Sequence, residues 1–326
     1  MVAFYSPIEL VVILILACVF LAFVLGWNNS SLTTGNLSNL VTYTVAVALT
    51  LVGMLTGFLL EGSKMTHSVL GKLVQSPIGA TEILIGTLVS LTLFLALTLT
   101  KIPVSLSNCV VGSFVGVALA SKAVISSRSL IEILASWLIA PFFCLGVAIL
   151  IYEVATRSEG SISLPTVSWI NRLVLFAAVF YVSYSLGANN VGLILSFVIR
   201  TNVLKFSVGE ELGIELAIYF GIALGTMLFG KSIAKVLGEK IVTLSQVKTV
   251  AAMLGAAFVT WILTQFSIPV SLTQVVLGGM LGAGSAKGPT IVNTRGLMTM
   301  IWRWAAITVL CTAAGFGIEY LLLQLY

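Results

Sequence analysis

Two pairs of adjacent asparagines are the residues best suited to chemistry in this sequence. Asn28 and Asn29 stand in the stretch GWNNSS, and Asn189 and Asn190 in GANNVG, each pair close to a glycine in a long apolar run. An amide carries hydrogen-bond donors and an acceptor. Backbone outside a helix is tolerated at membrane depth only where protein buries it or water reaches it. We therefore expect that the glycines permit a break in each helix and that the amides there bind freed backbone groups or a ligand. The alternative is that the asparagines only cap a helix or form hydrogen bonds to a neighbouring helix.

A second repeated segment supplies hydroxyl groups. IPVSLSNCVVGSFVG begins at residue 102 and IPVSLTQVVLGGMLG at residue 268. Proline suits the first position of a helix, where its missing N–H would have no partner, so Pro103 and Pro269 are predicted to start short helices. Such N-termini present free N–H groups and a positive dipole end, which together bind anions. The alternative is a proline-kinked helix with small packing residues. The hydroxyls expected at these ends are those of Ser105, Ser107, Ser271 and Thr273.

Both kinds of segment recur in the same order along the chain. The amide pairs are 161 positions apart and the Pro-Val-Ser segments 166 positions apart. We interpret this as a duplication, with a first repeat at 1–151, a linker at 152–168 and a second repeat at 169–326. Duplicated halves are common in secondary transporters, which bind substrate where the repeats meet.

The composition is that of an integral membrane protein. Of the 326 residues 59% are hydrophobic and 8% charged, whereas soluble domains average about 25% charged residues. Residues 10–60 and 249–286 contain no Lys, Arg, Asp or Glu, and a helix needs about 20 apolar residues to cross a bilayer. We expect an all-α, multi-pass protein of the cell membrane, with about ten segments in two inverted repeats and discontinuous or re-entrant helices. An odd number of membrane crossings in each repeat would make the two repeats inverted relative to one another. The count reaches five per repeat only if the segment 103–120 is itself a crossing. The predicted segments are 8–28, 40–60, 82–101, 103–120, 129–151, 169–187, 212–230, 246–266, 269–284 and 299–323.

Two opposed anion-binding helix ends beside two amide clusters indicate a small oxyanion as the ligand, and phosphate and sulfate both fit. The sequence has no Walker-type G-x-x-x-x-G-K-[ST] run, so a secondary transporter without cofactor is expected.

Basic residues stand mostly at segment ends, where they face lipid headgroups, and therefore do not indicate nucleic acid. One histidine and no aspartate make an enzyme a poor reading. An anion channel and a non-transporting sensor remain alternatives.

The quoted segments resemble the inorganic phosphate transporter (PiT) family. Its repeated marks are G-x-N-D-x-x-N and P-V-S-T-T-H-x-x-x-G-x-x-x-G, and the stretches at 135–141 and 230–244 also resemble it. The resemblance covers nearly the whole chain. It implies inverted repeats, discontinuous helices, a central phosphate site and coupling to Na⁺ or H⁺. Ser30, Ser31 and Thr34, which follow the first amide pair, are lower-ranked candidates for that site.

This chain departs from the family marks at several positions. The motif aspartate falls on Asn29 and Asn190, and the later asparagine of that motif on Leu32 and Leu193. The motif histidine falls on Asn108 and Gln274, which are also lower-ranked site candidates. The resemblance would place the chemistry of the coupling ion on the missing carboxylates.

Three consequences of the missing carboxylates stay open. Na⁺ could bind neutral oxygens near Asn29 and Asn190, or a remaining glutamate such as Glu82, Glu9 or Glu61 could carry a proton. Alternatively the substrate is sulfate, which needs donors only, whereas phosphate also donates a hydrogen bond that a carboxylate accepts. Phosphate is the first interpretation and sulfate the second. Homodimer formation is left open.

Overall fold

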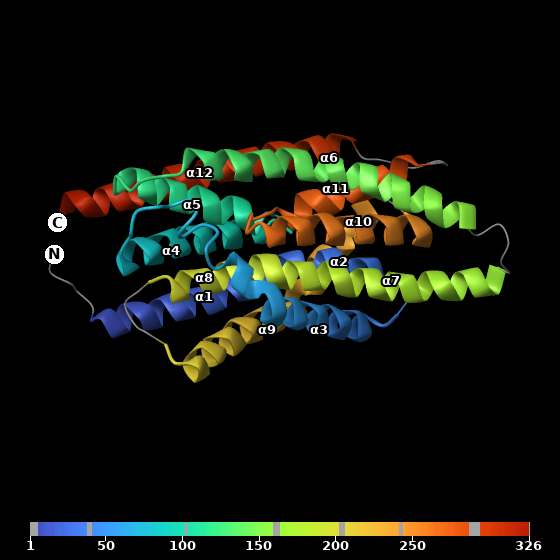
Figure 1. The fold of residues 1–326 in the computed structure, drawn as a ribbon, viewed down its shortest axis with the longest axis horizontal. Coiled ribbons are helices and arrows are strands. Elements are labelled where there is room, and N and C mark those ends of the chain that lie inside the picture. Colours follow the sequence, from blue (N-terminus) through green and yellow to red (C-terminus); the bar gives the residue numbers. More distant parts are fainter. Residues whose placement is uncertain are drawn as a thin grey trace.

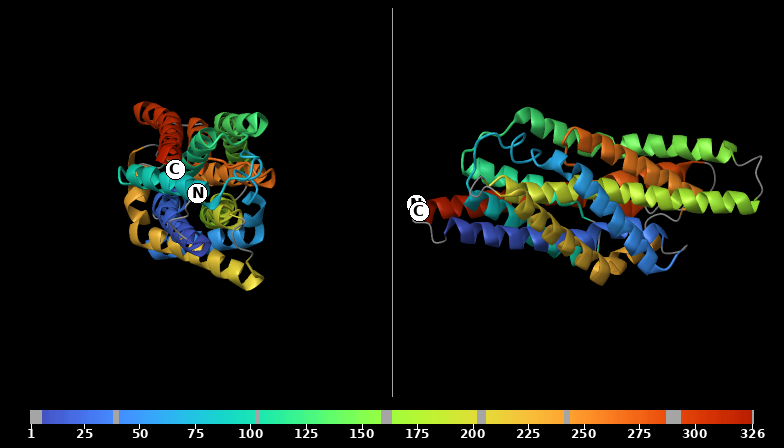
Figure 2. Two further views of the ribbon diagram at one scale, coloured as in Figure 1. Left: turned by 90° about the vertical axis from the view of Figure 1, so that its left-hand side faces the viewer. Right: turned by 60° about the horizontal axis from the view of Figure 1, so that its bottom comes forward.

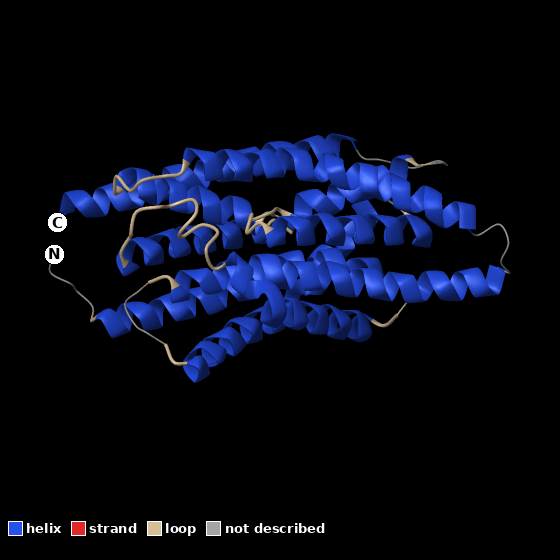
Figure 3. Cartoon of the chain, viewed as in Figure 1, coloured by secondary structure: helices blue, strands red, loops and turns tan. Residues whose placement is uncertain are grey.

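The computed structural model describes residues 6–37, 41–101, 104–158, 164–201, 206–240, 244–286 and 294–325. Its regular elements within these ranges are all helices (Figures 1 and 3). Eight helical stretches are long and apolar enough to cross a membrane, and two shorter apolar helices accompany them. The expected all-helical membrane protein with about ten apolar segments is therefore confirmed.

The helices follow one order in each half of the chain. The first half contains α1 (Pro7–Asn29), α2 (Ser31–Leu37), α3 (Tyr43–Glu61), the short η1 (Gly62–Met65), α4 (Ala80–Thr98), α5 (Leu106–Ala120) and α6 (Ser127–Ser158). The second contains α7 (Leu164–Leu186), η3 (Gly187–Val191), α8 (Gly192–Ile199), α9 (Val208–Lys240), α10 (Gln246–Gln265), α11 (Leu272–Ser285) and α12 (Thr294–Leu325). Because α6 continues to Ser158 and α7 begins at Leu164, much of the segment expected as a linker is helical.

The two halves run in opposite directions. In Figure 1, α1 runs from the left end of the molecule to the right, whereas α7 runs from right to left. The start of α1 and the end of α12 lie at the same end of the molecule (Figures 1 and 2). These directions match the expected inverted repeats.

The short helices α5 and α11 form the return arms of two helical hairpins. α4 and α5 enter from one end and α10 and α11 from the other, and both connecting loops lie near the middle (Figure 3). α5 has 15 residues and α11 has 14. At about 1.5 Å per residue, neither reaches across about 30 Å of hydrocarbon. The segment 103–120 is therefore no crossing. α4 and α10 are long enough to cross, but each ends at a turn near the middle, so the odd count per repeat comes from α1, α3 and α6 in the first repeat and from α7, α9 and α12 in the second.

Helices of one half pack against helices of the other: α1 packs mainly on α9, and α7 packs on α3. The glycine of each amide motif lies at one of these contacts. A Cβ on Gly26 would stand 2.1 Å from the carbonyl oxygen of Ile222 in α9, and one on Gly187 would stand 2.0 Å from that of Met54 in α3. These glycines permit close backbone packing. They thus have a packing role in addition to the expected one of permitting a helix break.

Candidate functional site

Both amide pairs lie where a long helix loses its regular hydrogen bonding. α1 ends at Asn29, and α2 begins after a single turn residue. In the second repeat the chain passes through the π-helical turn Gly187–Val191, which contains both amides. π-turns inside α-helices leave backbone groups out of register and are frequent at functional sites. The predicted helix irregularities are present, in two different forms.

Asn28 and Asn189 each hold the tip of one hairpin. Val104 N–H donates to Asn28 Oδ1 at 2.9 Å, and Asn28 Nδ2 donates to Thr98 Oγ1 at 3.1 Å. In the second repeat Val270 N–H donates to Asn189 Oδ1 at 3.2 Å, and Asn189 Nδ2 donates to Thr264 Oγ1 at 2.9 Å. The same two bonds thus recur in both repeats, and they fix backbone that has left the helix.

Each hairpin turns through a residue with a left-handed backbone, at φ 59° for Lys101 and 57° for Ser267. The following helices are capped by Ser105 and Ser271, whose hydroxyls accept from the N–H groups three residues on. Helix α11 begins at Leu272, so Pro269 precedes the cap and does not start the helix. Pro103 lies outside the described residues. Serine is a preferred N-cap because its oxygen satisfies an N–H of the first turn, and this signal points to the helix start more closely than the proline does.

The two tips are bonded to each other at the centre of the molecule. Ser107 Oγ of α5 donates to the carbonyl oxygen of Val270 at 2.8 Å, and Thr273 Oγ1 of α11 donates to that of Val104 at 3.3 Å. Ser105, Ser107, Ser271 and Thr273 are each at most 1% exposed. The four predicted hydroxyls therefore meet where the repeats meet, and the site is closed to both ends.

Asn29 and Asn190 differ from their neighbours Asn28 and Asn189. Both are 1% exposed. Neither Nδ2 nor Oδ1 of Asn29, nor Oδ1 of Asn190, has a hydrogen-bond partner among the described residues. Buried polar side-chain atoms are nearly always bonded, so such exceptions call for a ligand, an ion or water. These are also the two positions where the family motif has aspartate.

The hydroxyls after the first amide pair bond to nearby backbone. Ser31 Oγ donates to the carbonyl oxygen of Asn28 at 2.5 Å, and Thr34 Oγ1 donates to that of Ser30 at 3.1 Å. Ser30 Oγ donates to the carbonyl oxygen of Gly26. In this arrangement their protons satisfy carbonyls around the α1–α2 break, and their oxygens remain able to accept.

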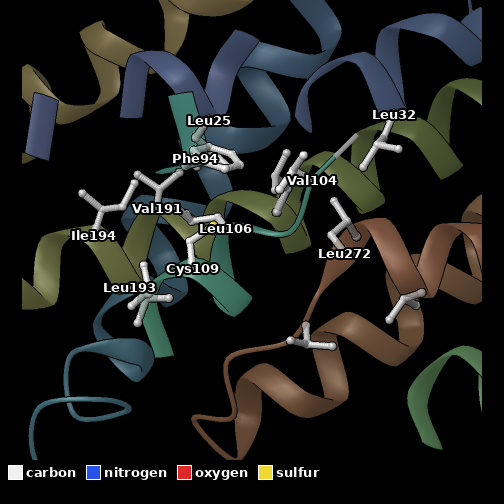
Figure 4. Close-up of a cluster of buried hydrophobic side chains, with 14 of the residues drawn as sticks. Leu25, Leu32, Phe94, Val104, Leu106, Cys109, Val191, Leu193, Ile194 and Leu272 are labelled. Carbon is white, nitrogen blue, oxygen red and sulfur yellow. The ribbon is translucent and has the colours of Figure 1, made fainter. Parts of the chain in front are cut away.

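Apolar side chains surround the tips (Figure 4). Val104, Leu106 and Leu272 lie among buried residues of α1, α2, α4 and α8. Leu32 and Leu193, which replace the later motif asparagine, are 1% and 0% exposed and belong to this cluster. An oxyanion here would lie in a medium of low polarity, where each donor that faces it interacts strongly.

The second tip is also held from the η1 side. Lys72 Nζ donates to the carbonyl oxygen of Phe266 at 2.8 Å, and Lys64 Nζ donates to Gln265 Oε1. Lys64 pairs in turn with Glu61 at 3.0 Å. This places two cations beside the loop that closes the site.

Each of the three glutamates considered as a proton carrier has a role in a helix cap, an ion pair or the first turn of a helix. Glu9 completes the capping box of α1, Glu61 is paired, and Glu82 is in the first turn of α4. Sequence reasoning missed Glu319 of α12. This residue is 3% exposed, and its Oε2 has no partner among the described residues. No motif surrounds it, and the only signal was a carboxylate in an otherwise apolar segment.

Fold and site together define a helical membrane transporter built from two inverted repeats, with a buried polar centre between two re-entrant hairpins. A sequence profile of the phosphate transporter family matches residues 31–171 and 163–315. The chain belongs to this family, whose members are transporters and not enzymes.

Individual relatives agree with this assignment. A protein of Methanocaldococcus jannaschii whose name describes a phosphate permease is 26% identical over 92% of this chain and 94% of its own length. The sulfate permease CysP of Bacillus subtilis is 28% identical over 87% of this chain and 78% of its own length. A solved structure titled as the sodium-dependent phosphate transporter superposes with a TM-score of 0.83, at 18% identity, over 98% of this chain and 100% of that one. At that identity the structure supports the fold.

Proposed function

We propose that this protein moves inorganic phosphate across the cell membrane by symport with H⁺ or Na⁺. The observation that carries the proposal is the meeting of two inverted helix N-termini, together with the unpartnered amide of Asn29 and the unpartnered Oδ1 of Asn190. The first N–H groups of α5 and α11 have no acceptor within their own helix. Together with Nδ2 of Asn29 they form a set of donors that can face a tetraoxyanion from both repeats.

The closed centre supports alternating access. The bonds from Ser107 to Val270 and from Thr273 to Val104 join the hairpins directly. Movement of one hairpin would break both bonds and open the site towards the end from which that hairpin enters. An anion bound to both tips would replace the lost bonds during the change.

Two routes of ion coupling are compatible with the described residues. The unpartnered oxygens of Asn29 and Asn190 are neutral ligands of the type that unwound transporter helices offer to Na⁺. For H⁺, a titratable group is required, and Glu319 is the buried carboxyl with an unpartnered oxygen.

Sulfate is the second candidate substrate. The replacement of both motif aspartates by asparagine removes the acceptors that a phosphate proton would use, and sulfate needs donors only. The similarity to a sulfate permease, over 87% of this chain, points in the same direction.

The test is uptake of labelled phosphate into liposomes that contain the purified full-length protein, with Na⁺ and pH gradients imposed separately and unlabelled sulfate as competitor. The proposal expects accumulation that follows one gradient and resists excess sulfate. Sulfate uptake without a response to phosphate would replace the first candidate by the second. Saturable phosphate binding without any accumulation would indicate a sensor.

A further inference from the structure

A groove between α6 and α12 contains none of the four central hydroxyls, although Asn108 and Gln274, two of the lower-ranked site candidates, line it. Its volume is about 580 Å³, and residues of α5, α6, α11 and α12 line it. None of the described residues that line it is charged. Rim residues are open to the surroundings, with Leu138 67%, Phe142 67% and Val309 68% exposed. α6 and α12 run along one side of the molecule (Figure 1). In a bilayer this groove faces the acyl chains.

The two repeats contribute matching residues to the groove. Five of the six α6 residues that line the groove have a counterpart in α12 that is 167 positions later and also lines it, so these two walls follow the approximate two-fold relation between the repeats. Its floor is formed by Asn108 and Gln274, which stand at equivalent positions in the first turns of α5 and α11. The groove therefore lies at the depth of the hairpin tips. The clearest matching pairs are Leu134 with Ile301, Trp137 with Trp304, and Leu138 with Ala305.

The floor of the groove offers acceptors that lack donors. Gln274 is 6% exposed, and its Oε1 has no partner among the described residues. Pro141 lies inside α6 and has no N–H, so the carbonyl of Trp137 lacks the usual donor of its own helix. Asn108, in contrast, is engaged, because its Nδ2 donates to the carbonyl oxygen of Trp304 at 3.2 Å and its Oδ1 accepts from Ser105 at 2.6 Å. An acceptor left unpaired in apolar surroundings is costly.

We infer that the groove binds a membrane lipid that combines an apolar body with a hydroxyl group, whose O–H donates to Gln274 Oε1. The apolar lining accounts for the body and the unpaired acceptor for the hydroxyl. A phosphate or carboxylate headgroup would find no cation among the described lining residues. A second copy of the chain that packed against the rim would cover the groove and leave the acceptor at its floor unpaired. A long-chain alcohol, with one apolar chain and one hydroxyl group, is the occupant that we propose.

The test uses the full-length protein in phosphatidylcholine nanodiscs. Dibromostearyl alcohol should quench the fluorescence of Trp137 and Trp304 saturably, because bromine quenches only at short range. Oleyl alcohol should displace it about tenfold more tightly than oleyl methyl ether, which has the same chain and no donor, since a buried unpaired acceptor is worth about that factor.

Variants separate the hydrogen bond from the apolar fit. Gln274→Leu should bring the affinity for oleyl alcohol down to that for the ether and leave the ether unchanged, whereas Gln75→Leu, on an exposed loop, should change neither. Leu138→Trp should fill the groove and lower the affinity for both ligands. This variant provides an independent test of the binding place if Gln274→Leu folds poorly. Equal affinities of the two ligands for the native protein would overturn the inference. So would a dimer that buries Phe142 and excludes both ligands.

Discussion

At the centre of the molecule, Asn28 uses both ends of its amide on the first hairpin, whereas the amide of Asn29 has no partner among the described residues. The second repeat repeats this contrast, with Asn189 bonded and Asn190 Oδ1 unpartnered. Because a buried group without a partner lowers stability, the unpaired amides are better explained by a ligand than by the fold. Position within the pair separates the two roles: the family resemblance already singled out Asn29 and Asn190, whereas the structural role of Asn28 and Asn189 was not foreseen.

The contrast predicts opposite phenotypes for neighbouring substitutions. Asn28→Ala removes the bonds to Thr98 and Val104, and should lower the free energy of unfolding by about 1–3 kcal/mol. Asn29→Ala removes no bond and should leave the apparent melting temperature unchanged. It should raise the KM for the transported anion about tenfold, since hydrogen bonds to charged groups are worth about 1.5–3 kcal/mol. Thermal unfolding in detergent and uptake kinetics measure the two effects, and identical behaviour of both variants would refute this division.

Glu319 gives a second prediction for a single residue. If this carboxyl carries the coupling proton, Glu319→Gln should abolish accumulation driven by a pH gradient and preserve the exchange of internal for external phosphate, which moves no net proton. Counterflow and gradient-driven uptake in the same liposomes distinguish the two activities, and Glu132→Gln on the surface of α6 serves as the control. Retained pH-driven accumulation in Glu319→Gln would remove this residue from the coupling mechanism.

At the scale of helices, the amide-motif glycines determine how closely the repeats approach. Gly187→Ala would place a methyl group about 2.0 Å from the carbonyl oxygen of Met54, so α7 and α3 must separate. We expect a loss of about 1–3 kcal/mol from overpacking. Gly213→Ala in α9 meets nothing within 4 Å and should stabilise by about 0.5–1 kcal/mol, as alanine is the better helix former. Melting temperatures of the two variants provide the measurement; a Gly187→Ala protein as stable as the native one would contradict the packing.

The second hairpin should depend on its lysine contact. Lys72→Met removes the donor to the carbonyl oxygen of Phe266 while it preserves much of the apolar side chain. Hydrogen–deuterium exchange should then increase at residues 266–271, and exchange at the first tip should stay as it was. Unchanged protection at 266–271 would mean that the central bonds alone hold this loop.

Much of this arrangement was predictable from the sequence. The apolar runs predicted the membrane segments, and the recurrence of the amide and Pro-Val-Ser stretches predicted that their side chains meet. Re-entrant helices were expected, but whether the segment 103–120 crosses was harder to foresee, because α5 is an apolar run of 15 residues that resembles a short crossing. What reverses the chain is the left-handed backbone at Lys101 and Ser267, residues that have no strong turn preference. Glu319 and the acceptors in the groove are defined by packing between distant helices, which leaves no local pattern.

For the whole molecule, the fold assigns the described basic residues to one of its two ends or to a hairpin tip, and this predicts the orientation. Cytoplasmic ends are enriched in Lys and Arg. Among the described residues, the end at which α6 finishes and α7 begins carries eight Lys and Arg residues, the other end carries five, and Lys101 is at a hairpin tip. The eight are Arg157, Arg172, Lys231, Lys235, Lys240, Lys248, Arg295 and Arg303. We expect this end in the cytoplasm and the start of α1 and the end of α12 outside.

Cysteine labelling checks this orientation. The native cysteines within the described residues are buried and free, so an introduced exposed thiol reports its own position. An impermeant maleimide applied to intact cells should label Gln75→Cys and spare Ser245→Cys until the membrane is opened. The reverse pattern would invert the assignment.

Because α1 rests on α9 and α3 rests on α7, the first repeat cannot complete its packing until the ribosome has made most of the second. During synthesis, the helices of the first repeat are therefore in the bilayer before the helices that pack on their glycines and amides have been made. The nascent chain therefore depends on the insertion machinery or on surrounding lipid to shield these surfaces. Two halves made as separate chains could assemble only by exchanging helices with each other, and neither half could serve as a folded template for the other.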